Sequence, residues 1–223
     1  MMRGVHHQVS CANPVTLVNL RHGIRERLDY VQNKGKSKGD EWPHNELYRE
    51  LERHRTRGLD EEFWDFLVDT LTKWSAIRGT EEHTKEAIHT EGLKRLPELR
   101  RCFYRLARNG NSKLPTVETV EWADVEPLFN VAWQVKKCKN NSPVFASKLC
   151  HFLVPSAYFI FDNTLVKPGW NEYRDYWEDC RRAWLDRSDK QALRPELRKK
   201  IPDPCSTFPW PTKITELCQF PND

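Results

Sequence analysis

Helical periodicity is the feature that most constrains how this chain can fold. Apolar residues recur at steps of three and four along most of it, and no stretch keeps the strict apolar-polar alternation of a half-buried strand. The first such stretch can be opened by Pro14, and Leu17, Leu20, Ile24 and Leu28 then lie on one helical face. The sequence therefore predicts an all-α protein.

Further helices are expected at regular intervals, separated by short polar connections. Asp60 can cap a helix that Gly79 ends, and Asp124 can cap another. The expected helical ranges after the first are 45–56, 61–78, 80–89, 97–107, 125–138, 143–153, 171–186 and 188–200. The proline-rich tail 202–223 is expected to pack as an extended arm with one short helix.

The length of the chain limits its domain organisation. At 223 residues it can form one substantial core or two small helical lobes. We expect residues 1–223 to form a single helical domain, with room for a division into two lobes. The segment 32–43 (QNKGKSKGDEWP) contains glycines and lysines, and we expect it to form a mobile basic loop.

The charge pattern permits nucleic-acid binding without demonstrating it. The formal net charge is +4, and Lys and Arg cluster at 34–38, 94–108, 136–139 and 194–200. These clusters are compatible with one basic face, and equally with solvated helix faces of both signs.

The remaining composition limits the cofactors and the location. The seven Cys form no C-x-x-C pair, so neither a zinc knuckle nor a disulfide framework is indicated, and we expect no metal and no cofactor. No apolar run reaches the length of about 18 residues that a membrane span needs. The first residues lack the apolar stretch of a signal peptide. We therefore expect a cytoplasmic protein without membrane contact.

The most informative segment is 140–169 (NNSPVFASKLCHFLVPSAYFIFDNTLVKPG). Lys148 and His151 lie three residues apart and share a face of the helix expected there. An apolar run then leads into Asp162, which stands where an N-capping carboxylate would. Apolar surroundings raise the basicity of such a carboxylate, whereas capping N–H groups hold it in place and oppose that shift. Lys148 could meet Asp162 across the gap between the two helices.

This segment resembles the helix-hairpin-helix DNA glycosylases, especially the microbial 8-oxoguanine glycosylases. The matching pieces are Lys148, His151-Phe152-Leu153 and Ile160-Phe161-Asp162, with the turn 139–142 in the place of the hairpin. The resemblance covers residues 125–169. It implies a compact helical arrangement of two lobes with a DNA cleft between them, and double-stranded DNA as the partner. We expect the protein to be a monomer.

Three departures from the family pattern are visible. Asn-Asn-Ser-Pro replaces the hairpin glycines, although Asn can adopt the left-handed conformation and a helix N-terminus still offers N–H groups to a phosphate. Lys148 is displaced by one residue from the family's lysine, and the connection to Asp162 is shorter. The four-Cys iron-sulfur loop of some relatives is missing.

The resemblance implies catalytic roles for Asp162 and Lys148. The carboxylate would stabilise the positive charge that develops on the sugar as the glycosidic bond breaks. Lys148 would either form a Schiff base with the sugar or stay protonated while water attacks. The implied DNA-binding residues are Lys136, Lys137, Lys139, Asn140, Asn141, Ser142 and Lys167. The candidates for a pocket that receives the extruded base are His151, Tyr158 and Trp170.

The expected function is a DNA glycosylase that excises a modified base and leaves an abasic site. Its substrate is open between glucosylated hydroxymethylcytosine of phage DNA, in antiviral defence, and 8-oxoguanine, in repair. A non-enzymatic nucleic-acid-binding module and a helical protein-protein interaction subunit also remain open. In the last case Asp162 is only a helix cap. Separate structural alternatives are a solvated surface lysine for Lys148 and a half-buried histidine for His151.

Overall fold

The computed structural model describes residues 11–33, 45–77, 84–108, 114–136, 142–162, 170, 172–201 and 203–221. Within these ranges every regular element is a helix, which confirms the all-α fold class. The helices are α1 (Leu17–Asn33), α2 (Asn45–Arg57), α3 (Glu61–Lys73), α4 (Lys85–Arg108), α5 (Trp122–Val135), α6 (Val144–Leu153), α7 (Tyr173–Leu185), α8 (Lys190–Arg198) and α9 (Trp210–Cys218).

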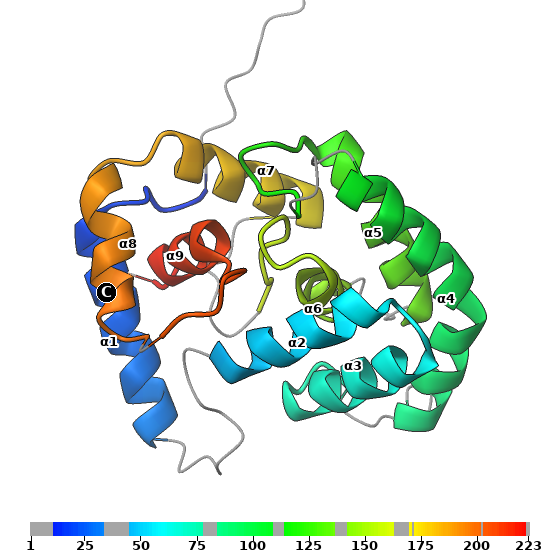
Figure 1. Cartoon of the computed structure of the whole chain (residues 1–223). Coiled ribbons are helices and arrows are strands. Elements are labelled where there is room, and N and C mark those ends of the chain that lie inside the picture. The colour runs from blue at the N-terminus through cyan, green and yellow to red at the C-terminus, as the bar shows by residue number, and fades with distance from the viewer. Residues whose placement is uncertain are drawn as a thin grey trace, which may run out of the picture.

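Helix α6 lies in the middle of the molecule (Figure 1). Helices α2, α3 and α5 pack against it, and α4 packs on α3 and α5. Helices α1, α8 and α9 contact one another and form a second group, and α7 joins the two groups by contacting both α5 and α9. The first and last helices of the chain are therefore neighbours. The finer expectation, two lobes on either side of a DNA cleft, remains a prediction.

Helix α6 is buried along nearly its whole length because its sequence, VFASKLCHFL, is mostly apolar on every face. All of its residues from Phe145 to Leu153 are buried, including Lys148 and His151. A polar side chain in such surroundings is costly unless it finds hydrogen-bond partners. The hydrogen-bond partners of Lys148 and His151 therefore determine the charge state and the possible chemistry of these two side chains.

Helix α3 starts as the sequence predicts and ends earlier than predicted. The Asp60 carboxylate accepts the Phe63 N–H at 2.8 Å, as expected of an N-cap. The helix stops at Lys73 rather than near Gly79, because Ser75 adopts the left-handed conformation at φ 55°. The Ala76 and Ser75 amides then bond back to the Leu71 and Thr72 carbonyls, the Schellman pattern that closes a helix.

Two other expectations about the helices are corrected. The ranges 80–89 and 97–107 do not form separate helices. Within the described residues one helix, α4, runs through Pro97, and burial of Leu96 and Leu99 on either side compensates for the interruption. Asp124 is not the cap of α5: it lies at the third helical position and closes a capping box with Glu121. The mobile basic loop expected at 32–43 lies almost wholly outside the described residues.

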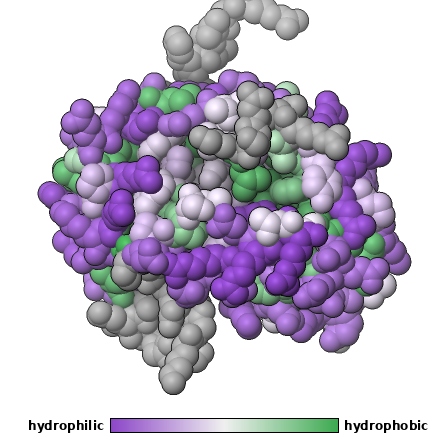
Figure 2. Space-filling model, in the orientation of Figure 1, coloured by the Kyte–Doolittle hydropathy of each residue, from purple (hydrophilic) through white to green (hydrophobic). Residues whose placement is uncertain are grey.

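The tail is also more compact than expected. It does contain one short helix, α9, and this helix is largely buried and packs on α1, α7 and α8. Hydrophilic residues cover most of the face seen in Figure 2, and hydrophobic residues gather near the middle of that face. None of the described helices is both long and apolar enough to cross a membrane.

Candidate active site

The structure brings Lys148 and Asp162 together. The Lys148 Nζ lies 3.3 Å from the Asp162 Oδ2. The lysine comes from the buried helix α6, and the aspartate from the chain that returns after it. The two side chains differ in exposure, at 6% for Lys148 and 22% for Asp162. Asp162 is therefore the member of the pair that a ligand can reach from solvent. Residues 163–169, where Asp162 was expected to begin a helix, lie outside the described part of the chain.

Two of the predicted site residues, Lys148 and Lys136, donate hydrogen bonds at the C-terminal end of α3. Lys148 donates to the Trp74 carbonyl at 2.9 Å, and Lys136 donates to the Ala76 carbonyl at 2.7 Å. The partial negative charge at a helix C-terminus favours cations there. Sequence reasoning missed this contribution because it expected α3 to continue to Gly79.

Asp162 follows residues 157–161, a stretch outside the helices, and side chains donate to four of its backbone carbonyls. Trp177 Nε1 donates to the Ala157 carbonyl at 2.9 Å, and His151 Nδ1 donates to the Tyr158 carbonyl at 2.7 Å. Tyr173 Oη donates to the Phe159 carbonyl at 2.7 Å, and Tyr176 Oη donates to the Ile160 carbonyl at 2.9 Å. A buried segment outside helices and strands needs such partners because unpaired backbone groups are costly. The aromatic residues of α7 thus fix the course of the chain before the aspartate.

The backbone N–H groups of the two residues before Asp162 also form hydrogen bonds to side chains. The Ile160 N–H donates to Glu216 Oε1 at 2.7 Å, and the Phe161 N–H donates to Ser147 Oγ at 3.1 Å. Glu216 belongs to α9 and Ser147 to α6. The backbone leading into Asp162 is therefore fastened to helices from both groups of the fold.

A second ion pair lies close to the first. The Lys213 Nζ is 2.8 Å from Glu216 Oε2, and the exposed fractions of these side chains are 11% and 14%. The Lys213 ammonium also lies 5.9 Å from the Tyr48 ring centroid and 5.8 Å from that of Trp74. Burial raises the pKa of Glu216, and the Lys213 charge opposes that rise. Sequence reasoning missed this pair because it treated the tail as an arm; the i, i+3 spacing inside an apolar helix was the available signal.

The two predicted pocket residues from the centre of the fold are buried. His151 Nδ1 faces the Tyr158 carbonyl, which can only accept, so Nδ1 carries the proton and Nε2 accepts from the Tyr48 hydroxyl at 2.8 Å. Burial holds the pKa of His151 well below its usual range, so the ring is neutral. The Tyr158 hydroxyl donates to the Val125 carbonyl at 2.7 Å. Neither ring is exposed to solvent, and their part in a base pocket remains a prediction.

The other predicted residues lie elsewhere or outside the described ranges. Trp170 is partly buried, donates to Asp179 at 3.0 Å and meets the Tyr176 ring edge-on. Ser142 stands just before α6 and is partly buried. The predicted DNA contacts outside the described residues are Lys137, Lys139, Asn140, Asn141 and Lys167.

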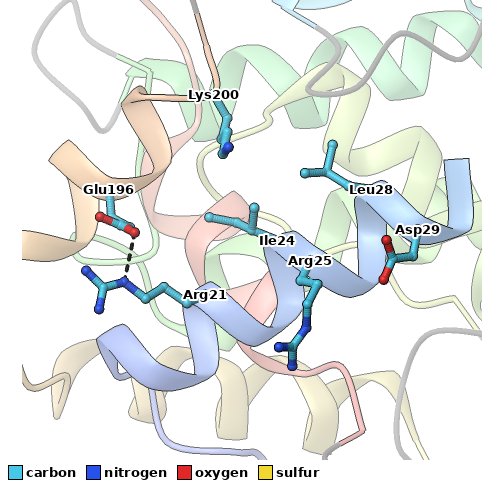
Figure 3. Close-up of a pocket in the computed structure, with 7 residues that line it drawn as sticks. All are labelled: Arg21, Ile24, Arg25, Leu28, Asp29, Glu196 and Lys200. Carbon is cyan, nitrogen blue, oxygen red and sulfur yellow. Dashed lines mark hydrogen bonds and ion pairs between the residues drawn. The ribbon is translucent and has the colours of Figure 1, made fainter. Parts of the chain in front are cut away.

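A separate cavity of about 330 Å³ lies between α1 and the end of α8 (Figure 3). Its lining residues are Arg21, Ile24, Arg25, Leu28, Asp29, Glu196 and Lys200. Arg21 and Lys199 bind Glu196 and lower the pKa of that carboxyl to about 2. None of the lining residues belongs to either ion pair described above, so this cavity is distinct from the candidate active site.

A scan against protein-family models finds no match to the chain, and searches among curated proteins and among solved structures find none either. The chemistry proposed for this site therefore depends on its own geometry.

Proposed function

We propose that the protein is a DNA glycosylase that releases a modified base and uses Asp162 as its catalytic carboxylate. The observation that carries the proposal is the 3.3 Å contact between Lys148 and Asp162, in which the aspartate keeps an exposed edge while the lysine is enclosed. A carboxylate held in a fixed position at the boundary between core and solvent is suited to stabilising a developing positive charge.

In the proposed reaction the glycosidic C1′–N bond of an extruded nucleotide breaks and positive charge develops on the sugar. Asp162 stabilises this charge and orients a water molecule, whose oxygen forms the new bond to C1′. The proton that the water loses passes through the carboxylate, and the departing base takes up a proton to leave as the neutral species. The product is an abasic site.

Lys148 acts in this proposal as the support of Asp162, with water as the nucleophile. Its ammonium contacts a carboxylate and the C-terminal end of a helix, and both contacts favour the positive charge. A charged amine cannot attack the sugar carbon, and only 6% of this side chain is exposed. A Schiff-base reaction would require the amine to leave both partners and lose its proton.

The proposed DNA position is between the group formed by α1, α8 and α9 and the group formed by α2 to α6. In this proposal the two groups take the place of the two glycosylase lobes, and the exposed edge of Asp162 faces the duplex. The proposed substrate is a modified base, with glucosylated hydroxymethylcytosine and 8-oxoguanine as the two classes to compare.

The test is base release from defined DNA by the wild-type protein and by Asp162→Asn. The substrates are phage DNA carrying glucosylated hydroxymethylcytosine, duplexes with 8-oxoguanine, and unmodified duplexes, and alkali-sensitive abasic sites are counted. We expect release from one modified substrate and a loss of at least about 100-fold in Asp162→Asn, as for other groups that stabilise transition-state charge. DNA binding and the circular dichroism spectrum of the variant should match those of the wild type.

Other outcomes would contradict the proposal in distinguishable ways. A covalent adduct trapped by borohydride would make Lys148 the nucleophile in place of water. Salt-dependent DNA binding without release from any substrate would indicate the non-enzymatic binding module. Absence of DNA binding would favour an interaction subunit, in which Asp162→Asn alters stability alone.

A further inference from the structure

We propose that Glu216 of α9 is a positioning residue for Asp162, acting through the Ile160 amide. This inference rests on the proposed function, because it assigns to Glu216 the task of holding the catalytic carboxylate where a nucleotide can reach it. Its geometric basis is independent of that function and can be measured without any substrate.

The connection from Glu216 to Asp162 is short. Glu216 Oε1 accepts the Ile160 N–H at 2.7 Å, and Ile160 precedes Asp162 by two residues. On the other side Ser147 accepts the Phe161 N–H, and Lys148 contacts the Asp162 carboxylate. Helix α6 thus holds this stretch from one side and α9 from the other, so the location of the carboxylate depends on both helices.

The chemistry of Glu216 sets it apart from the other groups that hold the run 157–161. Trp177, Tyr173, Tyr176 and neutral His151 donate to carbonyls, and Ser147 accepts through a hydroxyl. Glu216 accepts through a carboxylate, which forms shorter and stronger hydrogen bonds to N–H groups than a neutral oxygen does.

A carboxylate in this place must be neutralised, and Lys213 does this. Taking a carboxylate out of water is unfavourable unless a partner charge and hydrogen bonds replace the hydration. Lys213 supplies the charge to Oε2, and the Ile160 amide supplies the hydrogen bond to Oε1. The pair on α9 therefore keeps a strong acceptor available for the chain that carries Asp162.

The test compares two double variants that both remove the buried charges. Lys213→Met with Glu216→Gln keeps a side-chain carbonyl that can accept the Ile160 N–H. Lys213→Met with Glu216→Leu offers no acceptor but has a similar volume. Removing Lys213 in both avoids leaving an unpaired ammonium, which would disturb the fold by itself. The matched control is Glu196→Gln, which breaks the ion pair between Glu196 of α8 and Arg21 of α1.

The first readout is amide hydrogen exchange at Ile160 and Phe161 in the free protein. An amide left without its partner opens more readily, so exchange at Ile160 in the Leu variant should be about tenfold to a hundredfold faster than in the Gln variant. Exchange in the core of α5 should be equal in the two, which shows that the fold is retained. Equal exchange at Ile160 in the two variants would overturn the inference.

The second readout is base release in single turnover with saturating enzyme. A displacement of the carboxylate should lower the rate constant in the Leu variant by up to about 100-fold while DNA affinity stays constant. The Gln variant should recover most of this loss, and Glu196→Gln should match the wild type. Equal rates in the Gln and Leu variants would contradict the positioning role. If the wild type releases no base at all, the proposed function fails, and the exchange comparison still decides whether Glu216 holds the segment.

Discussion

At the scale of single residues, the centre of the protein contains two polar side chains, Lys148 and His151, inside one buried helix. Their spacing predicted a shared helical face, and both do lie in the core. A fully buried lysine is rare unless paired, so the surface alternative was reasonable before the structure. What decided the matter was the set of partners: Trp74 and Tyr48 come from distant parts of the chain, and Asp162 and Tyr158 come from the segment that follows α6.

The neutral state of His151 predicts a pH dependence of stability. Its pKa in the folded protein is held well below its value in the unfolded chain, which is about 6.5. The unfolded state therefore takes up a proton below that pH and the folded state does not. The stability associated with this residue is fully present above pH 6.5 and falls as the pH drops below it, by up to about 1.4 kcal/mol per pH unit.

The measurement is the imidazole proton resonance of His151 followed between pH 7.5 and pH 5, together with the free energy of unfolding in urea. The resonance should stay at its neutral position while the protein remains folded, and the free energy should decline over the same range. A titration midpoint near the usual histidine value would contradict the burial described here.

At the scale of elements, local signals predicted the helices and tertiary contacts set their limits. Periodicity alone located α1, α2, α6, α7 and α8, and Asp60 correctly marked the start of α3. The end of α3 depends on Ser75 in a left-handed conformation, and the continuity of α4 depends on packing around Pro97. The Lys148–Asp162 contact followed from spacing on two successive segments, whereas the Lys213–Glu216 pair required α9 to be folded inward.

The close approach of α1 and α9 gives a prediction for Gly23. A methyl group added there would lie 1.9 Å from the Leu217 carbonyl oxygen, a backbone atom that cannot move without shifting α9. Gly23→Ala should therefore lower the free energy of unfolding by about 1–3 kcal/mol, despite the higher helix propensity of alanine. Urea unfolding measures the change. Val18→Ala, at a position on the same helix that is 75% exposed, should change stability by less than about 0.5 kcal/mol. Equal effects of the two substitutions would contradict the close packing.

At the scale of the whole molecule, the early and late parts of the chain form one unit. Asn13 donates from its backbone to Gln219 at 2.8 Å across a sequence separation of 206 residues. Its side-chain amide also donates to the carbonyls of Cys218 and Phe220. Helix α9 covers α1 and at the same time supplies the pair that holds the candidate active site, so the site depends on the complete helical assembly.

A chain that ends at Ile201 is therefore expected to lose cooperative folding. It lacks Ile214 and Leu217, both buried, and leaves the inner face of α1 and the Ile160 amide without partners. Thermal unfolding followed by circular dichroism should lose its sharp transition, and limited proteolysis should cleave the chain throughout. A chain that ends at Pro221 keeps α9 and should unfold like the full sequence. A cooperative transition in the shorter chain would contradict the dependence on α9.

The pairing of α1 with α9 also has a consequence for biosynthesis. Translation produces α1 well before α9, so Leu20 and Ile24 lack their native cover until α9 has been synthesised. Contacts between residues this far apart in sequence form slowly, because a long loop must close before they stabilise anything. The native contacts of α1 thus have to wait for α9, and chaperones that shield apolar segments would act on the nascent chain during that interval.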